Sequence, residues 1–220
     1  MIEIREVSSG NIADFYAACI PPEDEFLRAE RESGDWFIER TGWGSGGFVA
    51  YEDGNPVGRV EFHLLEESFA AISGENLYFM PCINVREKVQ KKGCGRALME
   101  KVFEATADRK GLVTVAAEGW MPKEFFLEMG FEVAQQMGLV YLLLKKHQGD
   151  AQCAWMPLAF FARDEPGEVN VEVVMSYQCP YMTVNYRRLM AKAAALSEKV
   201  QVTEYVLSDR ESFRKYGEMN

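Results

Sequence analysis

The chain has 220 residues, 48 % of them hydrophobic and 26 % charged, which is enough to bury the core of one ordinary domain with a smaller unit beside it. Asp and Glu outnumber Lys and Arg by 34 to 24, so the net charge is -10, without a basic stripe that would neutralise nucleic-acid phosphates. This composition excludes global disorder and disfavours DNA or RNA as a partner, and it is compatible with a cationic substrate such as an amine.

Residues 1–7 alternate apolar and charged side chains like a half-exposed strand, without the basic start and apolar run of a signal peptide. Nothing approaches the roughly 18 consecutive apolar residues of a membrane span. The five cysteines are irregularly spaced, with no paired C-x-x-C for zinc or a disulfide scaffold. We therefore expect a cytoplasmic protein with reduced thiols, no metal and no membrane partner.

The first elements are predicted from helix breakers and turn residues. A helix is expected from residue 11 to about 19, and a second one over 25–39 after the proline pair. Residues 48–51 and 57–64 flank an Asp-Gly turn and predict a hairpin. A further strand is expected over 77–85, where Pro81 lacks an N–H and must interrupt pairing.

Side-chain alternation assigns faces to these strands. In the strand 57–64, Arg59, Glu61 and His63 share the face opposite the apolar one, which puts a carboxylate beside an imidazole. In the strand 77–85, alternation predicts one face with Leu77, Phe79, Ile83 and Val85 and another with Tyr78, Met80, Cys82 and Asn84.

The second half of the predicted domain begins with a helix over 93–110, whose apolar residues recur every three or four positions. A strand is expected over 112–117 and a helix over 122–129, which starts at a proline and stops at a glycine. Two strands, 131–134 and 139–144, close the sheet.

A glycine-containing turn, Gln90-Lys91-Lys92-Gly93-Cys94-Gly95, joins the strand 77–85 to the helix 93–110. Such a turn leaves backbone N–H groups unpaired at the end of the helix, where the dipole adds roughly half a positive charge. The glycines allow close approach, so a diphosphate fits. Taken alone, the pattern also suits a simple tight turn.

The turn has further motifs around it, and together they resemble the GNAT superfamily of N-acetyltransferases. Gln90-x-x-Gly93-x-Gly95 matches the Q/R-x-x-G-x-G/A signature, Ile83-Asn84-Val85 matches the strand end that pairs with the pantetheine arm, and residues 125–131 look like the F-Y-x-K-x-G-F helix end. The resemblance covers residues 1–146. It implies an α/β (α+β) fold, the GNAT acyl-CoA acyltransferase fold, with a mixed twisted sheet flanked by helices.

By this resemblance the co-substrate is acetyl-CoA, with its pyrophosphate on the amides of residues 91–96 and its pantetheine along residues 83–85. The implied coenzyme-binding residues are Ile83, Asn84, Val85, Lys91, Lys92, Gly93, Cys94, Gly95, Arg96 and Phe126. Cys94 takes a position that relatives fill with a small apolar residue, so we interpret it as a packing residue.

Acetyl transfer needs a neutral amine, and an alkyl ammonium has a pKa of about 10.4, so a base or a desolvated site must remove its proton. The candidate bases are Glu118, Glu61 and His63. Phe126 stands where relatives often have the tyrosine that protonates the thiolate, and Gly119 where they often have an asparagine. The candidate substitutes for the missing acid are Cys82, Tyr78 and Tyr141.

The remainder of the chain is predicted to hold a linker, 147–168, and a βαβ unit, 169–220. The apolar linker residues Trp155, Leu158, Phe160 and Phe161 are expected to dock onto the first domain. The unit contains a strand over 169–174, a helix over 180–196 and a strand over 200–207.

Cys179-Pro180 at the start of this helix resembles the C-P-x-x start of thioredoxin-like folds, with Met182 in place of the second cysteine. The arrangement resembles the YoaP-like extension of some GNAT proteins, without the later cis-proline and strands of a complete thioredoxin-like domain. Cys179 is the candidate redox thiol, because a helix N-terminus favours a thiolate.

The sequence thus predicts an N-acetyltransferase that passes the acetyl group to a primary amine of a small molecule or peptide by direct attack. Two alternatives stay open, a noncatalytic acyl-CoA-binding sensor or adaptor and a thiol redox module that uses Cys179. A homodimer is also considered. Residues 20–45 and 66–76, which would select the acceptor, carry no transferable motif.

Overall fold

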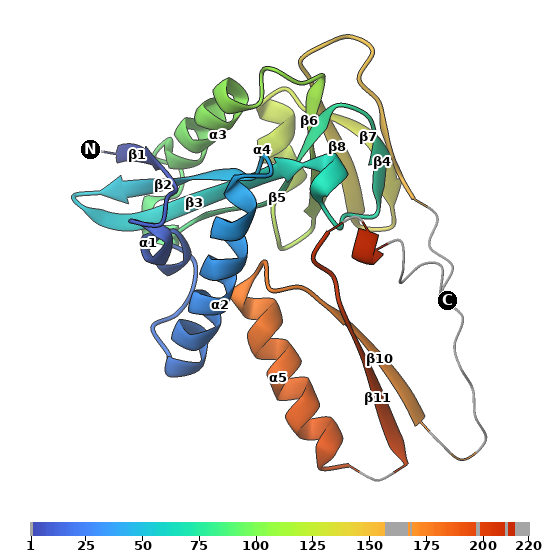
Figure 1. Ribbon diagram of the computed structural model, residues 1–220. Helices are drawn as coiled ribbons and strands as arrows, with labels where there is room; N and C mark the ends of the chain where they lie inside the picture. The colour runs from blue at the N-terminus through green and yellow to red at the C-terminus, as the bar shows by residue number, and fades with distance from the viewer. Residues whose placement is uncertain (1, 157–166, 168, 197–198, 210, 214–220) are drawn as a thin grey trace.

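The computed structural model describes residues 2–156, 167, 169–196, 199–209 and 211–213. Its centre is a seven-stranded sheet in the order β1-β2-β3-β5-β6-β8-β7 (Figure 1). The β5 and β6 strands are parallel, and all other neighbours in this sheet are antiparallel. The strands are β1 (Ile2–Glu6), β2 (Gly46–Glu52), β3 (Asn55–Leu64), β5 (Leu77–Val85), β6 (Gly111–Ala117), β7 (Glu132–Met137) and β8 (Val140–Lys146). The mixed sheet that the sequence predicts is confirmed.

Helices cover both faces of the sheet, which confirms the predicted layers (Figure 1). The helices are α1 (Ile12–Ala17), α2 (Asp24–Thr41), α3 (Cys94–Ala105) and α4 (Lys123–Glu128), with short 3-10 turns η1 (Leu65–Glu67) and η2 (Glu87–Val89). Val49 of β2 packs in the cluster that contains α1 and α2, whereas its neighbour Ala50 packs in the cluster that contains α3 and α4. Alternation along the strand therefore supplies apolar side chains to both layers.

One pair of strands was not predicted. β4 (Ile72–Gly74) pairs antiparallel with β9 (Cys153–Trp155), inside segments that the sequence suggested were a loop and a linker. Strands of three residues show no periodic pattern, so alternation could not reveal them. Trp155 packs against the cluster around Leu65 and Leu77, the docking expected for it; Leu158, Phe160 and Phe161 lie outside the described residues.

A bulge at Pro81 changes the faces of β5. Opposite this strand, Phe62 of β3 is the single residue between the pairs Glu61↔Cys82 and His63↔Phe79, so two residues of β5 face one of β3. The extra residue reverses the alternation beyond it. The predicted grouping of Ile83 and Val85 with Leu77 and Phe79 is therefore wrong. Instead, the face toward α3 has Tyr78, Met80, Ile83 and Val85.

The C-terminal unit is a parallel strand pair joined by a helix. It consists of β10 (Val169–Met175), α5 (Pro180–Ala194) and β11 (Val200–Val206), in agreement with the predicted βαβ order. α5 lies beside α2 (Figure 1), where Arg187 pairs with Glu32 at 2.5 Å and the rings of Tyr181 and Phe26 are 4.8 Å apart. This packing places the loop before α5 against the central sheet.

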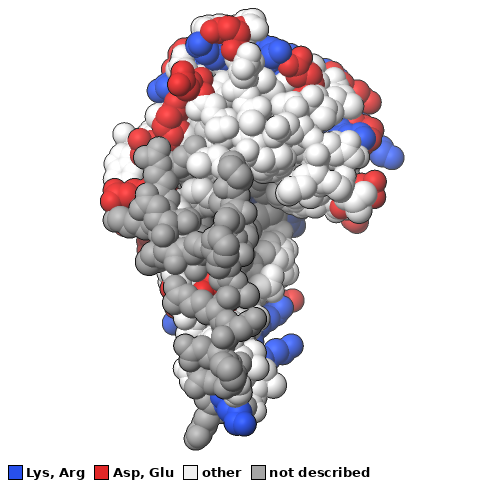
Figure 2. All heavy atoms as spheres, turned by 90° about the vertical axis from the view of Figure 1, so that its right-hand side faces the viewer, with Lys and Arg blue, Asp and Glu red and all other residues white. Residues whose placement is uncertain are grey.

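Charged side chains of both signs are intermixed on the surface. Figure 2 shows them along the rim of the upper part of the molecule, around an area without charged side chains. None of the described helices has the length and apolar composition that crossing a bilayer would require.

Candidate active site

The predicted glycine turn forms the N-terminus of α3. Gly93 is the N-cap residue with φ +86°, and Lys91 has φ +61°, so the chain turns sharply through the left-handed region. No side chain caps the helix. Within the described part of the chain, the backbone N–H groups of residues 91–96 have no hydrogen-bond acceptor. The turn therefore presents a cluster of free donors at the positive end of a helix dipole.

The side chains around the turn divide into packed and exposed ones. Cys94 is buried and packs under the turn, where burial raises the pKa of its thiol; it is a packing residue, as expected. Lys91, Lys92 and Arg96 are exposed, and Lys92 Nζ lies 3.8 Å from a carboxylate oxygen of Glu52. These three exposed cationic residues belong to the same segment as the free donors.

Phe125, rather than Phe126, is the aromatic residue beside the turn. A Cβ built on Gly95 would lie 3.3 Å from the Phe125 ring, so any side chain at this position would require the ring to shift by a few tenths of an ångström. Phe126 is fully buried and packs on Phe131, with ring centroids 5.5 Å apart. The sequence pointed to Phe126 rather than Phe125, because the rotation of a short helix cannot be fixed to one residue from its sequence.

The strands β5 and β6 separate next to the turn. Their pairing ends at Met80↔Thr114, where the Thr114 hydroxyl donates a hydrogen bond to the Met80 carbonyl at 2.7 Å. Beyond this point residues 83–85 pair only with β3, so their other edge lacks a strand partner among the described residues. The Gln90 side chain donates to the Val85 carbonyl at 2.9 Å and ties the strand end to the turn.

On the opposite face of the sheet, Arg59, Glu61 and His63 form a buried polar network, each at most 4 % exposed. The Arg59 guanidinium pairs with Glu61 Oε2, and His63 Nε2 lies 3.9 Å from Glu61 Oε1. The carboxylate and imidazole are thus neighbours, as alternation predicted. This face is covered by α1, α2 and the C-terminal unit.

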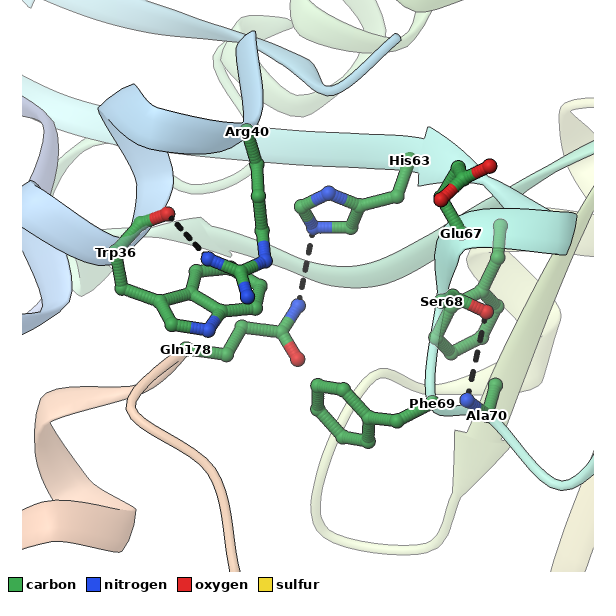
Figure 3. Close-up of a pocket in the computed structure, with 9 residues that line it drawn as sticks. Trp36, Arg40, His63, Glu67, Ser68, Phe69, Ala70 and Gln178 are labelled. Atoms are coloured by element: carbon green, nitrogen blue, oxygen red, sulfur yellow. Dashed lines mark hydrogen bonds between the residues drawn. The ribbon is translucent and has the colours of Figure 1, made fainter. Parts of the chain in front are cut away.

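Gln178, from the loop before α5, completes this network. Its side-chain Nε2 lies 2.6 Å from Glu61 Oε1. The same nitrogen lies 3.1 Å from His63 Nε2 (Figure 3). Burial alone would raise the pKa of Glu61, but the Arg59 guanidinium, helped by the Gln178 amide, holds that pKa below its ordinary value. Glu61 is therefore an ionised, hydrogen-bonded carboxylate, and sequence reasoning missed Gln178 because it is 117 positions away.

The remaining acid and base candidates are dispersed. Glu118 is exposed in a two-residue turn, closed by hydrogen bonds of 3.1 Å in both directions between Ala117 and Trp120. Tyr78 is buried at the α3 side of the sheet, near Arg109, and the Tyr141 ring lies 4.0 Å from Lys123 Nζ. Of the catalytic candidates, only Glu61, His63 and Cys82 lie together.

Cys82 faces Glu61 across the strand pair, and its environment opposes ionisation. Burial raises the pKa of this thiol to about 12. At pH 8 we expect iodoacetamide to label Cys82 at least about tenfold more slowly than an exposed free thiol, because the thiolate is the reactive form. Mass spectrometry of timed digests measures this rate, with denatured protein as the control; labelling at equal rates in both states would contradict the assignment.

The redox candidate Cys179 is half-buried at the N-cap position of α5 and precedes Pro180 at the first turn. All five cysteines of the chain are free thiols. Cys179 follows Gln178 directly, so its loop belongs to the interface between the C-terminal unit and the central sheet.

Comparisons with known proteins agree with this geometry. Residues 43–133 match the model of the acetyltransferase (GNAT) domain, and no curated protein matches the sequence. AAC(6')-Iy, solved with the bisubstrate analogue CoA-S-monomethyl-acetylneamine, superimposes with a TM-score of 0.52 at 14 % identity, over 62 % of this chain and 95 % of its own. A GNAT-family acetyltransferase from Streptococcus pneumoniae gives 0.50 at 16 % identity, over 66 % and 99 %. Such identities establish a shared fold. The family model covers residues 43–133, and the solved acetyltransferases share the fold of this part of the chain.

Proposed function

We propose that the protein transfers the acetyl group of acetyl-CoA to a primary amine of a small molecule or peptide. The observation that supports this most is the cluster of unpaired N–H donors at residues 91–96, beside the open edge of β5. A diphosphate suits such donors at a helix N-terminus, and an extended amide-bearing arm suits an unpaired strand edge.

The coenzyme-binding residues are proposed accordingly. The amides of Lys91 to Arg96 would hold the diphosphate, and residues 83–85 would pair with the pantetheine arm. Phe125 would form the wall next to Gly95. When bound, acetyl-CoA supplies the acetyl group as a thioester. AAC(6')-Iy, which shares this fold, was solved with an analogue that includes coenzyme A.

The chain's own residues would prepare the amine. An ammonium must lose a proton before it can attack, and Glu61 with His63 is the one pair of candidate bases that the structure brings together. Glu118 is the alternative base, at the end of β6. Cys82 and Tyr78 remain candidate acids, but a thiol whose pKa is about 12 is a poor donor to a thiolate whose conjugate acid has a pKa of about 8.5. We propose that the thiolate leaves without a general acid.

The test is an assay of free thiol released from acetyl-CoA in the presence of a panel of primary amines and amine-bearing peptides. Amine-dependent thiol release that produces the acetylated amine is the expected result. Tight acetyl-CoA binding without release on any amine would instead favour a noncatalytic acyl-CoA sensor, the alternative that Phe126 and Gly119 favour.

The other features of the proposal rest on the sequence. Four predictions from the sequence are untested by the structure. They are the likeness of the C-terminal unit to a YoaP-like, thioredoxin-like extension, the redox use of Cys179, the domain limits at 146 and 168, and a homodimer. Free cysteines are usual in a reducing compartment, and we propose a cytoplasmic location on this basis. Titration of Cys179 labelling against pH tests the redox alternative, which an ordinary thiol titration would contradict.

A further inference from the structure

The side-chain amide of Gln178 lies where two hydrogen-bond acceptors converge. Figure 3 shows it reaching from the loop before α5 toward His63, beside the rings of Trp36 and Phe69. Gln178 is 7 % exposed. Its nitrogen contacts Glu61 at 2.6 Å and His63 at 3.1 Å, so one buried N–H₂ group bridges a carboxylate and an imidazole.

The carboxylate determines which atoms of this network carry protons. An ionised carboxylate only accepts hydrogen bonds, so the nitrogen of Gln178, not its oxygen, must face Glu61. The second hydrogen of that nitrogen points to His63 Nε2, which therefore has its lone pair there. The remaining proton of a neutral imidazole is then on Nδ1, which donates to the Ser45 hydroxyl at 2.7 Å. His63 is thus held as the tautomer whose Nε2 can accept a proton.

Arg59 leaves one side of the carboxylate open to a nitrogen donor. The guanidinium contacts Glu61 Oε2, whereas Gln178 contacts Oε1. The pair Oε1 and His63 Nε2 is therefore a ready acceptor site for a group with two N–H bonds. A primary amine or ammonium has the same donors as the amide nitrogen.

The site lies near the point at which β5 and β6 cease to pair. Glu61 is directly opposite Cys82, which is two positions past Met80, the last residue of β5 to pair with β6. The residues beside it come from α2, from the segment after η1 and from the C-terminal unit, and they include Trp36, Phe69 and Gln178. Their cavity has a volume of about 10 Å³, room for about one water molecule. Binding of a larger ligand requires the Gln178 side chain to move.

Only the side chain of Gln178 needs to move, because its backbone is anchored. The Gln178 N–H donates to Ser176 Oγ at 3.1 Å, and its carbonyl accepts a hydrogen bond from the Tyr16 hydroxyl at 3.2 Å. Rotation about the side-chain bonds is the lowest-cost way to empty the position, since it leaves the docking of α5 on α2 intact.

We propose that the amide of Gln178 occupies the place of the acceptor's primary amine, and that Glu61 and His63 bind that amine once Gln178 rotates away. The proposal rests on the proposed acetyl transfer. The incoming ammonium donates one hydrogen bond to Glu61 Oε1 and another to His63 Nε2. Transfer of the second proton to Nε2 leaves a neutral amine and an imidazolium beside Glu61. The C-terminal unit thereby controls access to the acceptor site.

The test measures binding of n-butylammonium chloride, without acetyl-CoA, to the full-length wild type and to Gln178→Ala. The chain has only two histidines, so nitrogen-15 NMR of labelled imidazoles resolves His63, with His147 as an internal reference. In the wild type we expect the Nδ1–H tautomer of His63. In Gln178→Ala we expect the dissociation constant of the amine to fall at least about tenfold, with a shift of His63 Nε2 and none of His147.

Gln178→Ser should behave like Gln178→Ala and replaces it if the alanine variant does not fold, and Gln152→Ala is the matched control at an exposed glutamine. Unchanged or weaker amine binding in the Gln178 variants, or an Nε2–H tautomer in the wild type, would overturn the proposal. Because binding is measured without acetyl-CoA, its outcome is separate from turnover. Thiol release that is insensitive to Gln178 would leave the proposed function intact and reject this site.

Discussion

Replacing Arg59 with leucine is expected to lower the free energy of unfolding by about 3–5 kcal/mol, since it leaves Glu61 buried and ionised without its partner. Both side chains are at most 2 % exposed and paired with one another. The Arg59 guanidinium also lies 4.1 Å from the ring centre of Phe15 and 4.8 Å from that of Tyr16. Urea denaturation followed by circular dichroism measures the loss.

Two controls separate this effect from the general cost of a substitution. The double variant Arg59→Met/Glu61→Gln removes both charges and should recover at least about half of the loss, because no ionised group is then left unpaired. Arg5→Leu removes an exposed pair with Glu3 and should cost no more than about 1 kcal/mol. A loss at Arg59 as small as that at Arg5 would show that the network does not depend on this ion pair.

The same pair gives stability a pH dependence with a definite sign. The pKa of Glu61 in the folded protein is lowered below its ordinary value of 4.5, so the unfolded chain binds the proton more readily. The stabilisation is fully present above pH 4.5 and is lost as the pH falls through the lower, folded pKa. The double variant should lack this part of the acid dependence.

Local sequence signals predicted most of the fold. The Asp-Gly turn of the β2–β3 hairpin has φ values of +52° at Asp53 and +79° at Gly54, the conformation that these residues favour. Pro81 predicted that the pairing of β5 is interrupted, but it did not predict that the side chains beyond it change faces. Whether an interrupted strand has an extra residue depends on how it pairs with its partner strand. Here Phe62 of β3 lies opposite two residues of β5, and this pairing is known only from the structure.

The candidate site also has one part that the sequence predicted and one part that it did not. The turn before α3 was predictable, because its glycines, free donors and helix are contiguous in sequence. The burial of Arg59, Glu61 and His63 was not, since alternation identifies a shared face but not what covers it. Gln178 reaches that face only because α5 docks on α2, a contact between segments more than 150 positions apart. The proposed acceptor site therefore depends on tertiary packing that the sequence does not reveal.

Replacing Gly93 with valine is expected to raise the dissociation constant of acetyl-CoA at least about tenfold, equivalent to about 1.4 kcal/mol of binding free energy. Gly93 has φ +86°, which a β-branched residue resists. A Cβ there would meet nothing within 4 Å, so the new side chain would enter open space at the N-cap, next to the free N–H groups of the turn. Isothermal titration calorimetry with acetyl-CoA measures the change.

Gly138→Val is the matched control for this prediction. Gly138 also has positive φ, +58°, and open space around its Cβ, but it lies in the β7–β8 turn at the far edge of the sheet. Both variants should lose a similar free energy of unfolding, about 1–2 kcal/mol, through backbone strain. Only Gly93→Val should lose coenzyme affinity, because only that side chain crowds the helix N-terminus. Equal affinities in the two variants would mean that the diphosphate binds elsewhere, and the donors at residues 91–96 would then need another ligand.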